Sequence, residues 1–185
     1  MPDTDPLLRR EETGLIFVDV QEPLLRAIFN ADQVVEGYRL LAAAAHTLGL
    51  AGIVAEQNPD KLGPTAAVVA DAVADLPRFG KLTFSCCAQP ELMAAVRASG
   101  RRTWLLCGAE THVCITQTAL DLLAQGYRVQ VVADAVGSRT EANWRVGLDR
   151  IRAAGGEVTS VEMAVFELLR QAGTDDFRAL LKLFK

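Results

Sequence analysis

Cys114 is the residue of this 185-residue chain best suited to nucleophilic chemistry. It lies in the segment Gly108-Ala109-Glu110-Thr111-His112-Val113-Cys114, between a predicted strand and a predicted helix. With Thr111 as the helix N-cap, Cys114 falls in the first helical turn, where free backbone N–H groups and the helix dipole favour a thiolate. The alternative is a small cysteine buried in the core, which is the ordinary place of a free cysteine.

Asp19 and Lys81 could supply the charges that such a nucleophile needs. Asp19 directly follows the apolar run Leu15-Ile16-Phe17-Val18, so it ends a buried strand at the edge where parallel sheets bind ligands. A turn-forming aspartate is the alternative. Lys81 precedes Leu82-Thr83-Phe84, and at the start of such a strand it could place a positive charge near a carboxylate and a thiolate. Its alternative role is a solvated surface charge.

Several other kinds of site are not predicted. The chain has two histidines, His46 and His112, so a zinc or iron centre built on several imidazoles is not expected. His112 could act as a base for Cys114, but the loop can also point it elsewhere. No glycine-rich turn follows Asp19, which argues against nucleotide binding in the usual manner.

The elements that position these residues alternate along the chain. Strands are predicted at 15–18, 51–55, 81–85, 103–107, 127–132 and 157–161, and helices at 33–48, 65–76, 91–98, 115–124 and 141–154. This alternation predicts a three-layer α/β/α sandwich with a mainly parallel, five- or six-stranded sheet of Rossmann-like type. Residues 1–12 are expected to form a flexible arm and residues 13–185 a single domain.

Composition and net charge limit the classes of partner that we expect. The net charge is −4, and the basic residues form no long run, so neither nucleic acid nor an anionic membrane is an expected partner. No apolar stretch approaches the roughly 20 residues of a spanning helix. Four cysteines without a secretory signal predict reduced thiols and a cytoplasmic protein. Near the C-terminus, one helical face is apolar. This face either covers the sheet of its own chain or contacts another subunit, and it consists of Phe177, Leu180, Leu181 and Phe184.

Taken together, these segments resemble the isochorismatase-like cysteine hydrolase family. The resemblance covers about residues 13 to 170 and rests on three motifs in family-like order, with a fourth in the run 132–139. The motifs are residues 15–21 (LIFVDVQ), 79–85 (FGKLTFS) and 108–114 (GAETHVC) with Thr118-Ala119. Glu56-Gln57 before Leu62-Gly63-Pro64 is most similar to the isochorismatase-domain-containing branch of the family.

The resemblance implies a catalytic triad of Asp19, Lys81 and Cys114. It also implies a cis peptide bond between Ala109 and Glu110, which aims the backbone N–H groups of Glu110 and Cys114 at an oxyanion. The implied activity is hydrolysis of a small-molecule amide or related C–N bond through a thioester on Cys114. The candidate substrate-binding residues are Gln21, Leu62, Phe84 and Cys86, and Gln21 could instead orient Asp19 or begin a helix.

The departures from the family pattern shape the remaining expectations. Nicotinamidases of the family carry an aspartate and two histidines after the second strand as metal ligands, whereas residues 55–61 here (AEQNPDK) contain no histidine. We therefore expect neither a metal nor another cofactor, and nicotinamide is an unexpected substrate. Two alternatives stay open: a weakly active or non-catalytic oligomer that binds a metabolite or protein, and an isochorismatase-type vinyl-ether or ester hydrolase. A homo-oligomer acting on a small molecule is expected.

Overall fold

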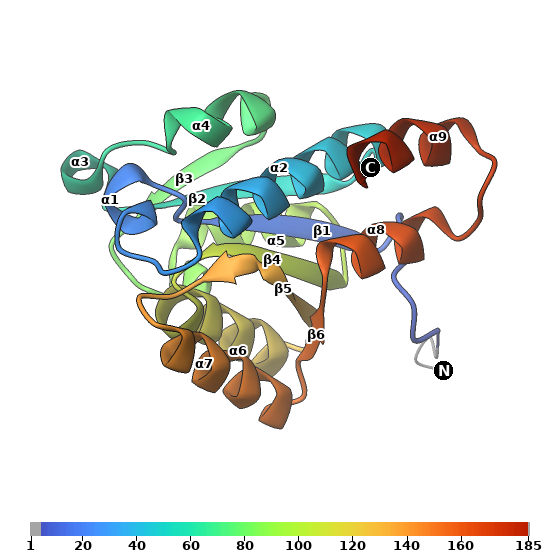
Figure 1. The fold of residues 1–185 in the computed structure, drawn as a ribbon. Coiled ribbons are helices and arrows are strands. Elements are labelled where there is room, and N and C mark those ends of the chain that lie inside the picture. Colours follow the sequence, from blue (N-terminus) through green and yellow to red (C-terminus); the bar gives the residue numbers. More distant parts are fainter. Residues whose placement is uncertain (1–4, 185) are drawn as a thin grey trace.

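The computed structural model describes residues 5–184 and is built on one six-stranded sheet (Figure 1). The strands are β1 (Thr13–Val18), β2 (Ala51–Gln57), β3 (Arg78–Lys81), β4 (Thr103–Ala109), β5 (Arg128–Gly137) and β6 (Glu157–Thr159). Their order in the sheet is β3-β2-β1-β4-β5-β6, and each neighbouring pair is parallel. The predicted α/β sandwich with a parallel sheet is confirmed.

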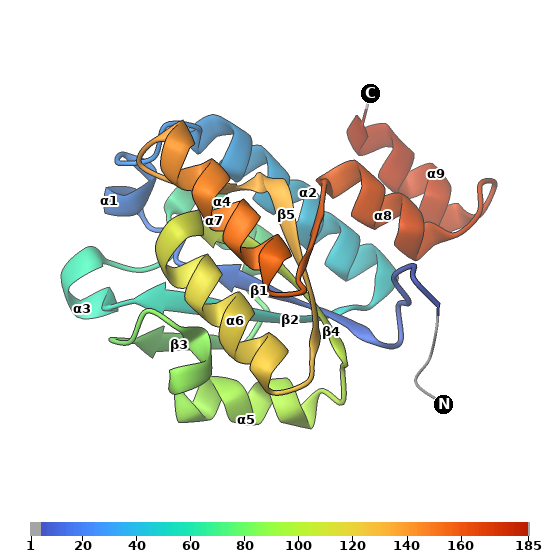
Figure 2. The ribbon, with the colours of Figure 1, turned by 90° about the horizontal axis from the view of Figure 1, so that it is seen from below.

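Helices cover both faces of the sheet (Figures 1 and 2). One layer holds α2 (Ala31–Leu48), α4 (Ala67–Ala70), α8 (Val161–Leu169) and α9 (Asp175–Leu181), and the other holds α5 (Pro90–Ala98), α6 (Thr116–Ala124) and α7 (Glu141–Ala153). The short helices α1 (Glu22–Leu25) and α3 (Pro59–Leu62) follow β1 and β2. Between residues 5 and 184, no helix is both long and apolar enough to cross a membrane.

The continuous apolar run of β1 is explained by a core on each side of the sheet. Leu15 and Phe17 belong to the hydrophobic cluster under α2 and α8, and Ile16 and Val18 belong to the cluster under α5 and α6. A strand buried on both faces has no polar side, so its sequence shows no alternation. β1 lies between β2 and β4, where the direction of the strand order reverses, and this is the point at which open α/β sheets bind ligands.

Three predicted elements differ most from the structure, and β2 also runs on to Gln57, past its predicted end at residue 55. β3 ends at Lys81 instead of beginning there, because its pairing with β2 stops at the pair Gln57 and Lys81. Residues 82–85 form a loop in which Leu82 is 76% exposed. The helix predicted at 65–76 is limited to α4 and a 3₁₀ turn, Asp71–Val73, and β5 runs on to Gly137.

Both ends of the described chain pack against α8. Phe177 and Phe184 contact the ring of Phe166 edge-on, with ring centroids 6.2 and 5.9 Å away, so the apolar C-terminal face covers its own chain. The N-terminal arm falls partly on residues 1–4, which lie outside the described residues. From residue 5 onward, Leu8 is buried and its N–H donates to Glu167 at 3.0 Å, so this stretch is held to α8.

Gly108 allows the two central strands to come together next to the predicted site. Its φ is +115°, a conformation that L side chains rarely adopt, and an added Cβ would lie 1.9 Å from the carbonyl oxygen of Val18. The close approach joins the end of β1, just before Asp19, to the end of β4, just before the Ala109–Glu110 bond. No residue other than glycine fits this contact.

We predict that Gly108→Ala lowers the free energy of unfolding by about 3 kcal/mol or more, because backbone strain and overpacking add at this position. The matched control is Gly155→Ala, where φ is +93° but nothing lies within 4 Å of an added Cβ. Its loss reflects backbone strain alone, about 1–2 kcal/mol. Urea unfolding measures both, and equal losses would show that the contact with Val18 is unimportant.

Candidate active site

Asp19 leaves β1 in an unusual backbone conformation. Its φ is +53°, in the left-handed region, and its N–H donates to the carbonyl oxygen of Ala55 at 2.9 Å. Such a conformation is uncommon for residues other than glycine, and strained residues of this kind gather at functional sites. The side chain is fully buried at the carboxyl edge of the sheet.

Lys81 uses all of its hydrogen-bonding capacity. Its Nζ donates to Asp19 Oδ2 at 2.7 Å, to Gln57 Oε1 at 2.7 Å and to the carbonyl oxygen of Thr83 at 3.3 Å. An ammonium group has three N–H donors and no acceptor, so each donor has one partner. Burial is the largest single effect and disfavours the ammonium, but the charge of Asp19, the hydrogen bond to it and the nearby Cys86 and Cys114 together outweigh burial and raise the pKa of Lys81. Lys81 is therefore a fixed positive charge and not a base.

Asp19 has one oxygen left for proton transfer. Oδ2 accepts from Lys81, whereas Oδ1 has no nitrogen or oxygen partner among the described residues, and the thiol of Cys114 is the remaining hydrogen-bonding neighbour of this carboxylate. Burial raises the pKa of Asp19, and the attraction of Lys81 offsets only part of that rise. A raised pKa makes the carboxylate a stronger base at neutral pH, and buried acceptors without partners are rare enough to need a reason. Oδ1 is placed to receive a proton.

Cys114 lies on a π-helical turn, Thr111–Ile115, that leads into α6, and it is 5% exposed. Its Sγ is 4.0 Å from Gln57 Oε1. Burial raises the pKa of Cys114, and the nearby charge of Asp19 raises it further against the opposing effect of Lys81. Burial and the carboxylate thus oppose the thiolate that the helix terminus favours. The thiol needs a base.

Residues at the end of β5 and just after it hold the turn that carries Cys114. The predicted N-cap role of Thr111 is wrong, because its hydroxyl donates to the carbonyl oxygen of Gly137 at 2.9 Å instead of capping the helix. The ring of His112 makes a 3.0 Å hydrogen bond with the hydroxyl of Ser138, which accounts for its Nδ1. On the other side, Gly147 of α7 leaves room for the backbone of Thr111 and His112, since an added Cβ would lie 3.1 Å away.

The peptide bond between Ala109 and Glu110 is cis. The carboxylate of Glu110 is buried and accepts from Arg139, from Nε at 2.8 Å and from Nη2 at 3.2 Å. This bidentate pair fixes the residue at which the chain turns from β4 toward Cys114.

Gln57, at the end of β2, is the site residue that the sequence analysis did not single out. Its Oε1 faces both Lys81 and Cys114, and its Nε2 donates to the carbonyl oxygen of Leu82 at 3.0 Å. Because an ammonium donates and a carbonyl accepts, these partners fix the orientation of the amide. Gln57 pairs with Lys81 where β2 and β3 run side by side. The strand predicted at 51–55 stops two residues too early to show this pairing.

Gln21 supports Gln57. Its Oε1 accepts from the backbone N–H of Gln57 at 2.8 Å, and its Nε2 donates to the carbonyl oxygens of Gln57 at 3.0 Å and Gly63 at 2.6 Å. Gln21 thus ties the end of β2 to the segment after Asp19. Gln21 is also the N-cap residue of α1, as the helix-start alternative predicted, and its side chain makes no hydrogen bond to Asp19 among the described residues.

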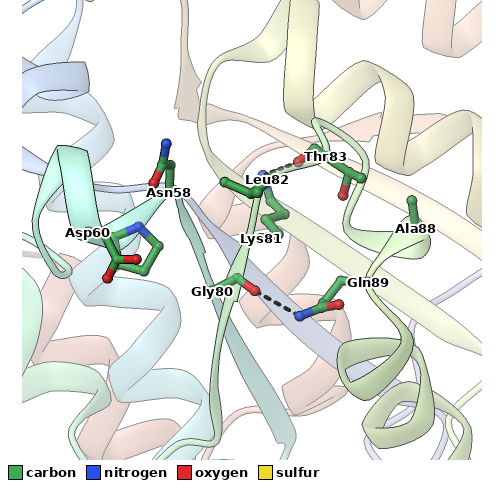
Figure 3. A pocket seen from close by; sticks show the side chains of 9 residues that line it. Asn58, Asp60, Gly80, Lys81, Leu82, Thr83, Ala88 and Gln89 are labelled. Atoms are coloured by element: carbon green, nitrogen blue, oxygen red, sulfur yellow. Dashed lines mark hydrogen bonds between the residues drawn. The ribbon is translucent and has the colours of Figure 1, made fainter.

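A cavity of about 490 Å³ opens beside Lys81 (Figure 3). Its walls are Asn58, Pro59, Asp60, Gly80, Lys81, Leu82, Thr83, Ala88 and Gln89. None of the four candidate substrate-binding residues belongs to this wall. Leu62 is half-buried at the end of α3, Phe84 is 52% exposed, and Cys86 is fully buried with its N–H bonded to Thr118.

The described residues, 5–184, contain no group of three or more His, Cys, Asp or Glu side chains arranged to hold a metal ion. Glu56, in the stretch where nicotinamidases carry metal ligands, is engaged otherwise. One of its oxygens accepts from the N–H and hydroxyl of Thr65, each at 2.7 Å, and from Arg78 at 3.0 Å. Its role is to hold the loop that follows α3.

The chain is similar in sequence to proteins of one known family. The family model described as "Isochorismatase domain" matches residues 13–163. The secreted isochorismatase effector Isc1 of Phytophthora sojae is 39% identical over 178 residues, covering 94% of this chain and 85% of the relative.

Two solved structures share the fold. The MAR1 ribonuclease from Caenorhabditis elegans is 30% identical, with a TM-score of 0.89, over 96% of this chain and 91% of that one. The YcaC gene product of Escherichia coli, described as an octameric hydrolase of unknown specificity, is 24% identical with a TM-score of 0.91, over 98% and 91% of the two chains. At that identity the second likeness concerns the fold alone.

We predict opposite effects for two substitutions of Gln57. Gln57→Met removes the acceptor, so one N–H of Lys81 is freed to stabilise a Cys114 thiolate, and the pH midpoint of Cys114 alkylation falls. Gln57→Glu adds a negative charge beside the sulfur and raises that midpoint. Mass spectrometry of Cys114 labelling against pH measures both, with exposed Gln117→Met as the control. Shifts in the same direction would mean that Gln57 only supports the fold.

Proposed function

Because the chain belongs to the isochorismatase family, whose members are hydrolases, we propose that it is a metal-independent cysteine hydrolase that needs no cofactor. It cleaves an amide or related C–N bond of a small molecule through a thioester on Cys114. The observation that carries this proposal is the buried Oδ1 of Asp19, unpaired with any described nitrogen or oxygen, beside a Lys81 whose donors are all engaged. Asp19 can take a proton, and the neighbouring Lys81 keeps its positive charge.

In the first half of the reaction, Asp19 Oδ1 takes the thiol proton of Cys114 and the sulfur attacks the carbonyl carbon. The backbone N–H groups of Glu110 and Cys114 hold the oxyanion that forms. When the tetrahedral intermediate collapses, the C–N bond breaks and protonated Asp19 gives its proton to the departing amine. A thioester on Cys114 remains.

In the second half, water attacks the thioester carbon while Asp19 takes a proton from it. The C–S bond breaks, the sulfur recovers the proton from Asp19, and a carboxylic acid leaves. The sum is amide plus water giving acid plus amine. Lys81 transfers no proton in either half: its charge holds Asp19 in place and moderates the pKa of the carboxylate and the thiol.

We also propose that the chain forms a homo-oligomer and works in the cytoplasm. Support for assembly comes from the octameric state named for the YcaC structure and from exposed apolar side chains such as Leu82, Val146 and Met163. All four cysteines are free thiols, which suits a reducing compartment, although the Phytophthora relative is named as secreted.

The test is turnover of a panel of small amides, esters and isochorismate by the wild-type protein and by Cys114→Ala. We expect amide hydrolysis, and a loss of at least about 10³-fold in kcat/KM in the variant, because no other group forms the thioester. Turnover retained in Cys114→Ala would overturn the thioester route. Activity on esters or isochorismate alone would assign the vinyl-ether or ester alternative, and inactivity on every compound would favour the binding protein.

Two further variants separate reactivity from catalysis. Asp19→Asn removes the negative charge that raises the pKa of the thiol, so Cys114 alkylates faster while turnover is lost with the base. Lys81→Met slows both alkylation and turnover, since its charge opposes that rise. Thermal unfolding monitors the fold, with exposed Asp149→Asn as the control. Faster turnover in Asp19→Asn would contradict the assignment of the base.

A further inference from the structure

The cavity beside Lys81 has no positively charged side chain that is free to bind an anionic ligand. Lys81 is the one positively charged residue among the nine that line it, and its three N–H donors are taken by Asp19, Gln57 and Thr83. Its charge is matched by the Asp19 carboxylate at 2.7 Å. A carboxylate or phosphate ligand in this cavity would therefore lose its hydration without gaining a counter-ion.

Two other polar side chains of the wall are engaged with the backbone, whereas the side-chain amide of Asn58 makes no hydrogen bond among the described residues. The hydroxyl of Thr83 donates to the carbonyl oxygen of Ser85 at 2.9 Å, and Nε2 of Gln89 donates to that of Gly80 at 2.8 Å. The Gln89 bond leaves its side-chain oxygen as an acceptor. The free donors of the wall, such as the amide of Asn58, are uncharged.

Asp60 adds a negative charge to the same wall. Its carboxylate is exposed and makes no hydrogen bond or ion pair with any other residue in 5–184. Figure 3 shows Asp60 and Gln89 on opposite sides of Lys81, so an acceptor lies on each side of the space. With the Asp19–Lys81 pair neutral, the wall carries a net negative charge.

Lys81 links the cavity wall to Cys114 through the side chain of Gln57. The Nζ of Lys81 lies 2.7 Å from Gln57 Oε1, and that oxygen lies 4.0 Å from the sulfur of Cys114. From this contact chain and the charge of the wall, we propose that the cavity is the entry to Cys114 and selects neutral or cationic carbonyl compounds over carboxylates. As a statement about substrates, this rests on the proposed hydrolase function.

Two ligand classes suggested by the names of relatives carry the wrong charge for this wall. Isochorismate bears two carboxylates, and a ribonucleic acid bears one phosphate charge for each nucleotide. Both would meet Asp60 without a free cation to offset it. Amides with an uncharged or amine-bearing side chain would instead place their N–H groups against the acceptors.

Alkylation of Cys114 tests whether the cavity selects ligands by charge, and it requires no known substrate. Iodoacetamide and iodoacetate react with thiols in the same way but differ by one negative charge. We expect Cys114 to prefer iodoacetamide over iodoacetate about fivefold or more beyond the preference of N-acetylcysteine, because a carboxylate near Asp60 is repelled. Asp60→Lys should remove most of that excess, whereas Asp32→Lys, an exposed aspartate outside the cavity wall, should leave it unchanged.

Several results would overturn the inference. A preference equal to that of N-acetylcysteine, or one that Asp60→Lys leaves unaltered, would show that the wall does not select charge. Absence of Cys114 labelling by either reagent, while Cys87 is labelled, would show that the cavity is not the entry to the sulfur.

Turnover then separates this inference from the proposed function. Two amides of equal length, one ending in an ammonium and one in a carboxylate, are compared in wild type and Asp60→Lys. Equal hydrolysis of both in the wild type would overturn charge selection and leave the hydrolase standing. Hydrolysis of neither, with alkylation still sensitive to Asp60→Lys, would overturn the hydrolase and support the charged entry.

Discussion

The buried ion pair between Asp19 and Lys81 is the interaction on which the rest of the site depends. Both side chains are completely buried, and their charged atoms are 2.7 Å apart. Removing two charges from water costs several kcal/mol for each ion, and their attraction repays this only when the remaining hydrogen bonds are also satisfied. Lys81 meets that condition and Asp19 does not, because its Oδ1 has no nitrogen or oxygen partner among the described residues. Stability alone gives no reason for such a pair, whereas a proton transfer from a buried thiol does.

The topology of the sheet explains how this pair meets its partners. The first four strands of the sheet order, β3, β2, β1 and β4, are neighbours, and each delivers one polar residue to the same edge. Lys81 ends β3, Gln57 ends β2, Asp19 follows β1, and Cys114 follows β4 after the cis bond. Since parallel strands all end at one edge, residues up to 95 positions apart are gathered without any long loop. The reversal of strand order beside β1 leaves the crevice that they share.

The sequence predicts those features of the site that depend on short stretches of the chain. An apolar run bounded by a polar residue identified β1 and Asp19, and a strand, a short turn and a helix placed Cys114. The strand assigned to residues 81–85 was misplaced because Leu82 and Phe84 are typical strand residues, and only pairing with β2 shows that β3 stops at Lys81. The protonation state of Cys114 depends on burial and on Asp19, which is distant in sequence, so local helix electrostatics alone do not describe it. Gln57 was missed for the same reason, since its importance arises from its partners.

Nitrogen-15 NMR of the lysine side chains tests the central claim most directly, namely that Lys81 is a permanent ammonium and Asp19 is the base. The chain has four lysines, Lys61, Lys81, Lys182 and Lys185, so the spectrum is simple to assign by single substitutions. The account predicts that Lys81 Nζ carries three protons throughout the neutral range, because the pKa of Lys81 is raised above the ordinary value of a lysine. A neutral amine on Lys81 near pH 7 would contradict it, because the lysine could then take the proton of Cys114 itself.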